Sequence, residues 1–138
     1  MIVIDTHVLV WAVEADVSRV GAKARKMLDA AARARALHVS AITPWEIAML
    51  AHHGRLALGR DVGEWIDQAL SLPGVTLAPL EPAIAIDSVR LPGELHKDPA
   101  DRIIIATARH LGFPVLTGDR AILAYGAKGY VQTIDAGK

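Results

Sequence analysis

The N-terminal stretch 2–4 constrains the fold of this chain more than any other segment. It consists of three consecutive β-branched apolar residues and is followed at once by Asp5. An uninterrupted apolar run of this kind is typical of a strand buried on both faces, as in the centre of a parallel sheet. Ligands of open α/β sheets bind beyond the carboxyl ends of the strands, near the point where the strand order reverses. The sequence therefore predicts that Asp5 lies where the chemistry of the protein takes place.

Further segments with strand character alternate with helical segments along the rest of the chain. Strands are expected at 37–40, 75–78, 114–117 and 130–134, and helices at 7–13, 18–36, 43–53, 62–72, 82–90, 99–111 and 120–125. Ser18, Thr43 and Asp98 are the expected N-cap residues of three of these helices. The alternation predicts an α/β fold, a three-layer α/β/α sandwich around a mostly parallel sheet of four or five strands. Because no linker or internal repeat interrupts it, we expect residues 1–138 to form a single domain.

The composition excludes several classes of protein. Cysteine is absent, which rules out disulfides, zinc-thiolate sites and a thiol nucleophile, and agrees with a cytoplasmic location. The longest later apolar run, 8–13, is far too short to cross a membrane, and Asp5 with no basic residue before it argues against a signal peptide. The formal net charge is zero. This argues against non-specific coating of nucleic acid but leaves room for basic residues around an acidic site.

Four carboxylates occupy corresponding positions next to the predicted strands. Asp5 and Asp119 directly follow strands, whereas Glu46 and Asp101 are each expected in the first turn of a helix, two residues after a proline. Because the carboxyl ends of parallel strands meet at one edge of a sheet, we expect all four to lie close together. Two like charges about 4 Å apart repel by about 4 kcal/mol at an effective dielectric of 20. A hard divalent cation such as Mg²⁺ or Mn²⁺ relieves this repulsion and activates water for attack on a phosphodiester.

Each of these acids also has an explanation that requires no function. Glu46 can complete a capping box, Asp98 and Asp101 favour a helix N-terminus, and Asp119 is a common turn residue. Protonation of the carboxyl groups, whose pKa values would then be raised, is an alternative to a cation as a way to relieve their repulsion. The occurrence of all four acids at one edge of the sheet is what favours a metal site.

Four short segments resemble the motifs of the PIN-domain nucleases, and within these the VapC-like toxins of bacterial and archaeal toxin–antitoxin pairs. The matching segments are 4–7 (IDTH), 40–47 (SAITPWEI), 98–102 (DPADR) with its IATA continuation, and 116–119 (LTGD). The resemblance implies a Mg²⁺- or Mn²⁺-dependent endoribonuclease, usually a homodimer and usually inhibited by a cognate antitoxin protein. It also implies that the catalytic and metal-binding acids are Asp5, Glu46, Asp101 and Asp119.

The resemblance extends to residues around the acids. Thr6 matches the small hydroxyl residue that often follows the first acid, and Asp98 is either an accessory metal ligand or only a helix cap. The family often has arginine before the last acid, where this chain has Gly118, so the base that contacts the phosphate is left open. The substrate-binding candidates besides Thr6 are Lys97, Arg102 and Arg120.

We therefore expect metal-assisted hydrolysis of a phosphodiester in single-stranded or looped RNA, with Asp5 as the central ligand. A phosphotransferase or receiver-type α/β domain that uses Asp5 is disfavoured, because haloacid-dehalogenase-like phosphatases usually carry a second Asp where this chain has His7. A non-catalytic module of the same fold that binds a basic partner through its acidic pocket is the alternative.

The histidines and tryptophans are expected to serve the structure more than the site. The six histidines are not spaced as a metal-binding set. His7 and His96 either flank the site or take core or surface positions, and the core or surface positions are expected. Trp11, Trp45 and Trp65 are expected to pack within the protein and not to serve as platforms on which bases stack. The apolar helix face around Trp65 and Leu70 is interpreted as either core or interface.

Overall fold

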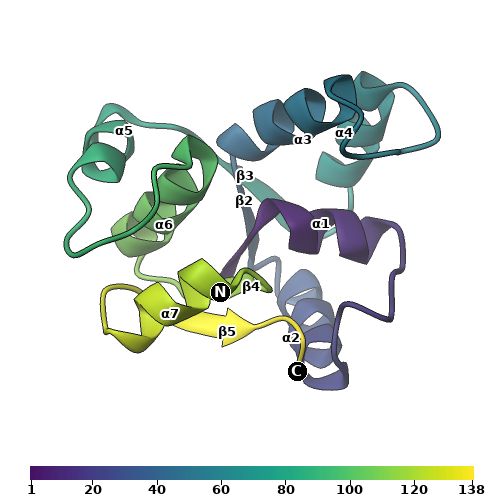
Figure 1. Cartoon of the computed structure of the whole chain (residues 1–138). Coiled ribbons are helices and arrows are strands. Elements are labelled where there is room, and N and C mark those ends of the chain that lie inside the picture. Colours follow the sequence, from purple (N-terminus) through teal and green to yellow (C-terminus); the bar gives the residue numbers. More distant parts are fainter.

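The computed structural model describes all of residues 1–138, which form one sheet with helices on both of its faces (Figure 1). The strands are β1 (Ile2–Ile4), β2 (Leu37–Ser40), β3 (Val75–Ala78), β4 (Val115–Thr117) and β5 (Thr133–Asp135). Their order in the sheet is β3-β2-β1-β4-β5, and every neighbouring pair is parallel. The predicted α/β sandwich is confirmed, with five strands and β1 at the centre.

Seven helices surround the sheet. They are α1 (Thr6–Val13), α2 (Ala22–Arg33), α3 (Ile42–His52), α4 (Val62–Leu70), α5 (Pro82–Val89), α6 (Pro99–Leu111) and α7 (Arg120–Ala127). In length and apolar character, none of them meets what a membrane-crossing helix requires.

The central strand β1 alternates its side chains between two hydrophobic clusters. Ile2 and Ile4 join a cluster that packs α1, α2, α3 and α4 against one face of the sheet. Val3 joins a second cluster, which packs α5, α6 and α7 against the other face. Successive residues of a strand point to opposite faces, so the apolar run of β1 has the predicted cause: both faces are covered by helices.

Several predicted boundaries are wrong. α2 begins after Gly21 and not after Ser18, because Ser18 directs both its N–H and its hydroxyl to the side chain of Asp16 in the preceding turn. α7 continues two residues beyond the predicted end. β5 begins at Thr133 and not at Tyr130, whose ring packs against Tyr125 with 4.9 Å between the centroids.

The start of α3 matters most for the site. Thr43 was expected as the N-cap, but the helix begins two residues earlier, after Ala41. The hydroxyl of Ser40 accepts the N–H of Ile42 at 3.2 Å, and the Thr43 hydroxyl is directed inward, 3.1 Å from the hydroxyl of Thr6. Glu46 therefore lies in the second turn of α3 and not in the first.

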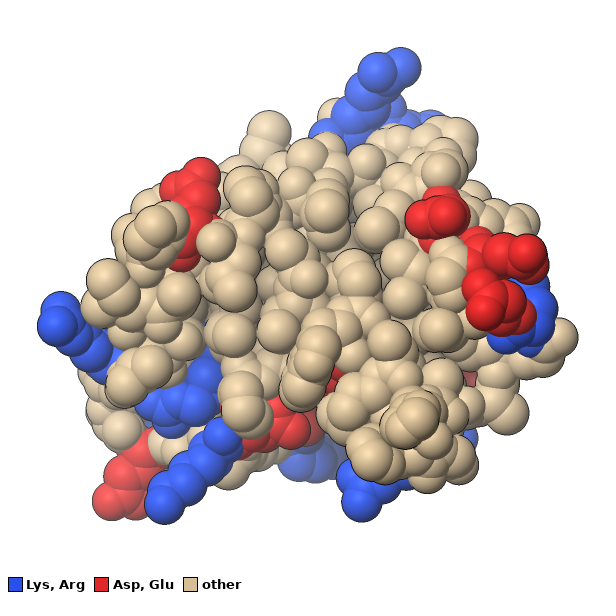
Figure 2. Space-filling model, turned by 90° about the horizontal axis from the view of Figure 1, so that it is seen from above, with Lys and Arg blue, Asp and Glu red and all other residues tan.

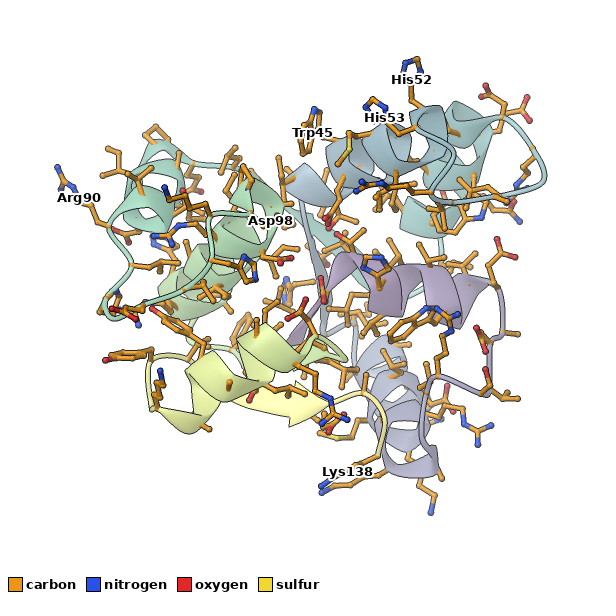
Figure 3. All side chains as sticks on the ribbon, in the orientation of Figure 1. Trp45, His52, His53, Arg90, Asp98 and Lys138 are labelled. Carbon is orange, nitrogen blue, oxygen red and sulfur yellow. The ribbon has the colours of Figure 1, made fainter.

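The tryptophans differ in their surroundings. Trp65 is only 1% exposed and belongs to the first hydrophobic cluster, while its ring N–H donates to Glu14 at 2.8 Å. The helix face around Trp65 and Leu70 is therefore core. Trp45 is 52% exposed and projects from α3 (Figure 3), so the prediction that it packs inside is wrong.

Candidate metal centre

Asp5 lies at the carboxyl end of β1 and is the N-cap of α1. The N–H of Thr6 donates to its Oδ1, and the hydroxyl of Thr117 donates to its Oδ2, both at 2.7 Å. Burial raises the pKa of Asp5, although the hydrogen bond from Thr117 opposes that shift. One donor on each oxygen fixes the orientation of the carboxylate and leaves further lone pairs available.

Asp101 reaches the same region from the first turn of α6. Asp98 caps this helix and accepts the N–H of Asp101 at 3.1 Å. The predicted inward face of the helix is buried, Asp101 included. Burial, followed by the negative charges of Asp5, Asp98, Asp119 and Glu46, raises the pKa of Asp101 to about 8. Near neutral pH this carboxyl therefore keeps its proton unless a cation replaces it.

Glu46 brings a carboxylate from α3 to the same place. One oxygen from each of Asp5, Glu46 and Asp101 lies within 4.8 Å of the others. The Oε1 atom of Glu46 is buried and has no hydrogen-bond partner, and burial raises the pKa of this residue. Buried polar atoms almost always have a partner. An orphaned oxygen beside two other carboxylates fits a bound cation.

A second group of three lies beside the first. One atom from each of His96, Asp101 and Asp119 lies within 4.8 Å of the others, so Asp101 belongs to both groups. Asp119 is the N-cap of α7, and its Oδ1 accepts the N–H groups of Ala121 and Ile122 at 2.8 and 3.0 Å. All four predicted acids thus meet at the carboxyl edge of the sheet. Their oxygen donors suit Mg²⁺ or Mn²⁺.

Three residues of this region are not among the predicted site residues. His96 lies with its Nε2 3.3 Å from Oδ2 of Asp101, whereas a core or surface position was expected. Its location two residues before the cap of α6 is a signal that would have allowed its ring to be placed over the first turn. Thr117 and Thr43 contact Asp5 and Thr6 respectively.

The other predicted site residues have varied positions. Asp98 lies outside both groups of three and serves as a helix cap, at the end of α6 that points toward α3 (Figure 3). The guanidinium of Arg102 donates to the carbonyls of Ser88 and Leu95 at 2.8 and 3.2 Å. It ties α6 to α5 and to the following loop, which argues against a direct contact with phosphate. Lys97 and Arg120 are exposed, and neither forms an ion pair.

The family model of the PIN domain matches residues 2–128, which is nearly the whole chain. The chain therefore belongs to the PIN-domain family. A curated relative is Ribonuclease VapC22 of Mycobacterium tuberculosis, which is 32% identical over 124 residues, 90% of this chain and 91% of that protein.

Two solved structures share the fold at low sequence identity. VapBC2 from Rickettsia felis, bound to a DNA fragment from the promoter, has a TM-score of 0.70 at 14% identity and 98% coverage of both chains. A toxin–antitoxin complex from Klebsiella pneumoniae has a TM-score of 0.58 at 21% identity, with 88% of this chain and 90% of that chain covered. At these sequence identities, both similarities show a shared fold alone.

Proposed function

We propose that this protein is a metal-dependent endoribonuclease and the toxin of a toxin–antitoxin pair. The observation that carries the proposal is the buried, unpartnered Oε1 of Glu46 among the carboxylates of Asp5 and Asp101. The named activity of the relative from Mycobacterium tuberculosis, which is similar over nine-tenths of the chain, supports the ribonuclease assignment.

The acids that would hold Mg²⁺ or Mn²⁺ are Asp5, Glu46, Asp101 and Asp119. A bound ion of this kind lowers the pKa of water and offsets the negative charge of a phosphodiester. Thr6 and Thr117 keep the Asp5 carboxylate in one orientation, and Glu46 keeps an oxygen free to accept a further donor. Asp101 would lose its proton when a cation binds, because the cation would replace that proton. No general-base histidine would be required, because a bound ion would itself lower the pKa of the attacking water.

The substrate would be RNA, held by its phosphates. Lys97 precedes the cap of α6 and Arg120 follows Asp119 directly, so both are near the acids in sequence and free of ion pairs. We do not assign a phosphate contact to Thr6, because its hydroxyl is buried and is within hydrogen-bond distance of the Thr43 hydroxyl. We assign the phosphate contacts to Lys97 and Arg120 in preference to Arg102, whose guanidinium is occupied.

The partners would be a cognate antitoxin and a second copy of this chain. The named complexes among the solved structures support an antitoxin partner. We also propose a cytoplasmic location, which agrees with the proposed RNA substrate. For the homodimer we propose the broad face seen in Figure 2, on which charged side chains lie mainly at the rim. Trp45 projects at this end of the molecule (Figure 3). Aromatic residues are enriched and charges depleted in interface cores.

The dimer is tested by the mass of Trp45→Glu in solution, measured by light scattering. We expect this variant to be a monomer and the wild type to be a dimer. Val17→Glu changes a residue that is also exposed, at 64%, but lies between α1 and α2, so it should leave the dimer intact. A dimeric Trp45→Glu protein would contradict the assigned face.

The nuclease activity is tested with antitoxin-free protein and a mixed pool of RNA, in Mg²⁺, Mn²⁺ or EDTA. We expect cleavage that requires the metal and that disappears in Asp5→Ala, while circular dichroism shows that this variant is folded. Folded wild-type protein that cuts nothing in either metal would contradict the proposal.

A second function draws on the same unpartnered oxygen of Glu46. An arginine from a partner protein would satisfy that atom, and the protein would then be a non-catalytic module with an acidic pocket. A calorimetric titration with Mn²⁺ distinguishes the two functions, because only the nuclease requires binding of the ion.

A further inference from the structure

His96 lies on the loop before α6 and contacts two positions of the first turn of that helix. Its Nδ1 accepts the backbone N–H of Asp98 at 3.3 Å, and its Nε2 lies 3.3 Å from Oδ2 of Asp101. The loop is fixed to α6 because the guanidinium of Arg102 donates to the carbonyls of Leu95 and His96. The imidazole is therefore held in place by contacts on both sides.

These contacts determine which ring nitrogen carries the proton. A nitrogen that accepts an N–H uses its lone pair and bears no hydrogen, so the proton of the neutral ring lies on Nε2. The Nε2–H then faces the Asp101 carboxylate. With its hydrogen in that position, Nε2 has no lone pair to offer a cation, although His96 lies within 4.8 Å of two carboxylates.

The support of Asp101 differs from that of Asp5. Asp5 receives one hydrogen bond on each oxygen, from Thr6 and from Thr117. No hydrogen bond from another side chain reaches the carboxylate of Asp101, so the contact with His96 is the one that orients it. Residues that orient a ligand in this way commonly change metal affinity by 10–100-fold.

We propose that His96 is a positioning residue, which orients the Asp101 carboxylate through its Nε2–H and does not itself bind the metal. The inference rests on the proposed metal-dependent function. With Oδ2 held by His96, the other oxygen of Asp101 would be available to an ion that Asp5 and Glu46 would also hold.

The test compares three variants of one residue. His96→Gln keeps an amide N–H near the position of Nε2. His96→Asn keeps an acceptor for the Asp98 N–H but is too short to reach Asp101, and His96→Ala removes both contacts. The matched control is His110→Ala, because His110 is a similarly exposed histidine of α6 whose Nε2 faces another carboxylate, Glu81, at 3.9 Å.

Affinity for Mn²⁺ is measured by calorimetry, together with the melting temperature of the metal-free protein and the kcat and KM for RNA. We expect Mn²⁺ to bind at least about tenfold more weakly to the Ala and Asn variants, and within about threefold of wild type to Gln. The fall in activity should be in kcat, with KM for RNA unchanged. His110→Ala should match the wild type in every measurement.

Three results would overturn the inference. Wild-type affinity in His96→Ala would show that His96 does not act on the site. A Gln variant as weak as the Ala variant would mean that a ring nitrogen binds the ion directly. Absence of Mn²⁺ binding by the wild type would overturn the proposed function and the inference with it, whereas the first two results leave the proposed function standing.

Discussion

The helices α3 and α6 contain the same order of residue types near their starts, yet they present their acids differently. In each, a polar residue and a proline are followed two positions later by an acid, Glu46 or Asp101. In α6 the polar residue, Asp98, is the N-cap, so Asp101 lies in the first turn and its N–H is bound by the cap. In α3 the helix starts two residues earlier, so Glu46 lies in the second turn with an unpartnered oxygen.

The difference shows that a capping motif sets the start of a helix only when no other contact competes for the same groups. Before α3, Ser40 binds the N–H of Ile42, and the hydroxyl of Thr43 is used by Thr6. Before α6, nothing displaces Asp98 from the cap.

The position in the first turn does not by itself keep Asp101 ionised. The helix dipole contributes about 0.3–1 kcal/mol in favour of a negative charge there. A single neighbouring carboxylate at about 4 Å opposes it by about 4 kcal/mol at an effective dielectric of 20. Burial adds to this opposition, and the pKa of Asp101 accordingly rises to about 8.

The largest effect is expected for Asp101→Asn, because Asp101 is shared by both groups of three. We expect Mn²⁺ affinity and RNA cleavage to fall by more than about 100-fold, beyond the range seen for residues that only support a ligand. The asparagine keeps the backbone contact with Asp98, so the helix start is retained. Cleavage at the wild-type rate would contradict the shared role.

The second-largest effect is expected on the stability of the folded protein as the pH changes, with EDTA present to remove metal ions. Asp101 has an ordinary pKa of 3.8 when unfolded and about 8 when folded, so between about pH 4 and 8 the folded state binds more protons. Stability must therefore fall as the pH rises through this window. Asp5 and Glu46, whose pKa values are also raised, act in the same direction.

Melting temperatures measured at pH 5 and pH 8 check this expectation. The value at pH 8 should be lower, and the difference should shrink in Asp101→Asn or when Mn²⁺ is added. A melting temperature that rises from pH 5 to pH 8 in EDTA would be inconsistent with the buried acids.

A smaller effect on the metal is expected for Glu46→Gln, which keeps the shape of the side chain and removes its charge. Mn²⁺ affinity should fall by about tenfold, because Asp5 and Asp101 still share the ion. The metal-free variant should melt at a higher temperature than the wild type at pH 8, since a buried charge is gone. A loss as large as that of Asp101→Asn would mean that the two acids are equivalent.

The smallest effect should come from the cap of α6. Asp98→Ala should lower the free energy of unfolding by about 1 kcal/mol, whereas Asp98→Asn should be nearly neutral because asparagine caps as well as aspartate does. Urea unfolding measures both. If Asp98→Asn abolishes Mn²⁺ binding, Asp98 is a metal ligand and not only a cap.

The sequence predicted those parts of the fold and site whose cause is local. The apolar run before Asp5 and the capped, amphipathic helix carrying Asp101 are each readable within a few residues. Predictions from the sequence failed where contacts between distant segments determine the structure. The Thr6–Thr43 contact, which joins residues 37 apart, is invisible from the pattern around Thr43.

Competition between equally local signals also misled the prediction. Ser18 has the character of an N-cap, but Asp16 captures its N–H and hydroxyl. The hydroxyl of Ser18 can cap a helix or bind a neighbouring side chain, so the residue type alone does not predict which of the two interactions forms. Trp45 shows the same limit for burial, because only the packed structure decides which side of α3 is covered.

The hydrogen bond between Thr117 and Asp5 joins residues that are 112 positions apart. At 5–20 residues per second, a ribosome adds the second of them roughly 10 s after the first. Until then Asp5 lacks one of its two donors, and neither Asp119 nor β4 exists. If the protein is the nuclease proposed above, a nascent or truncated chain is harmless to the RNA around it. The cell that makes this protein then has the whole time of its synthesis to prepare an inhibitor.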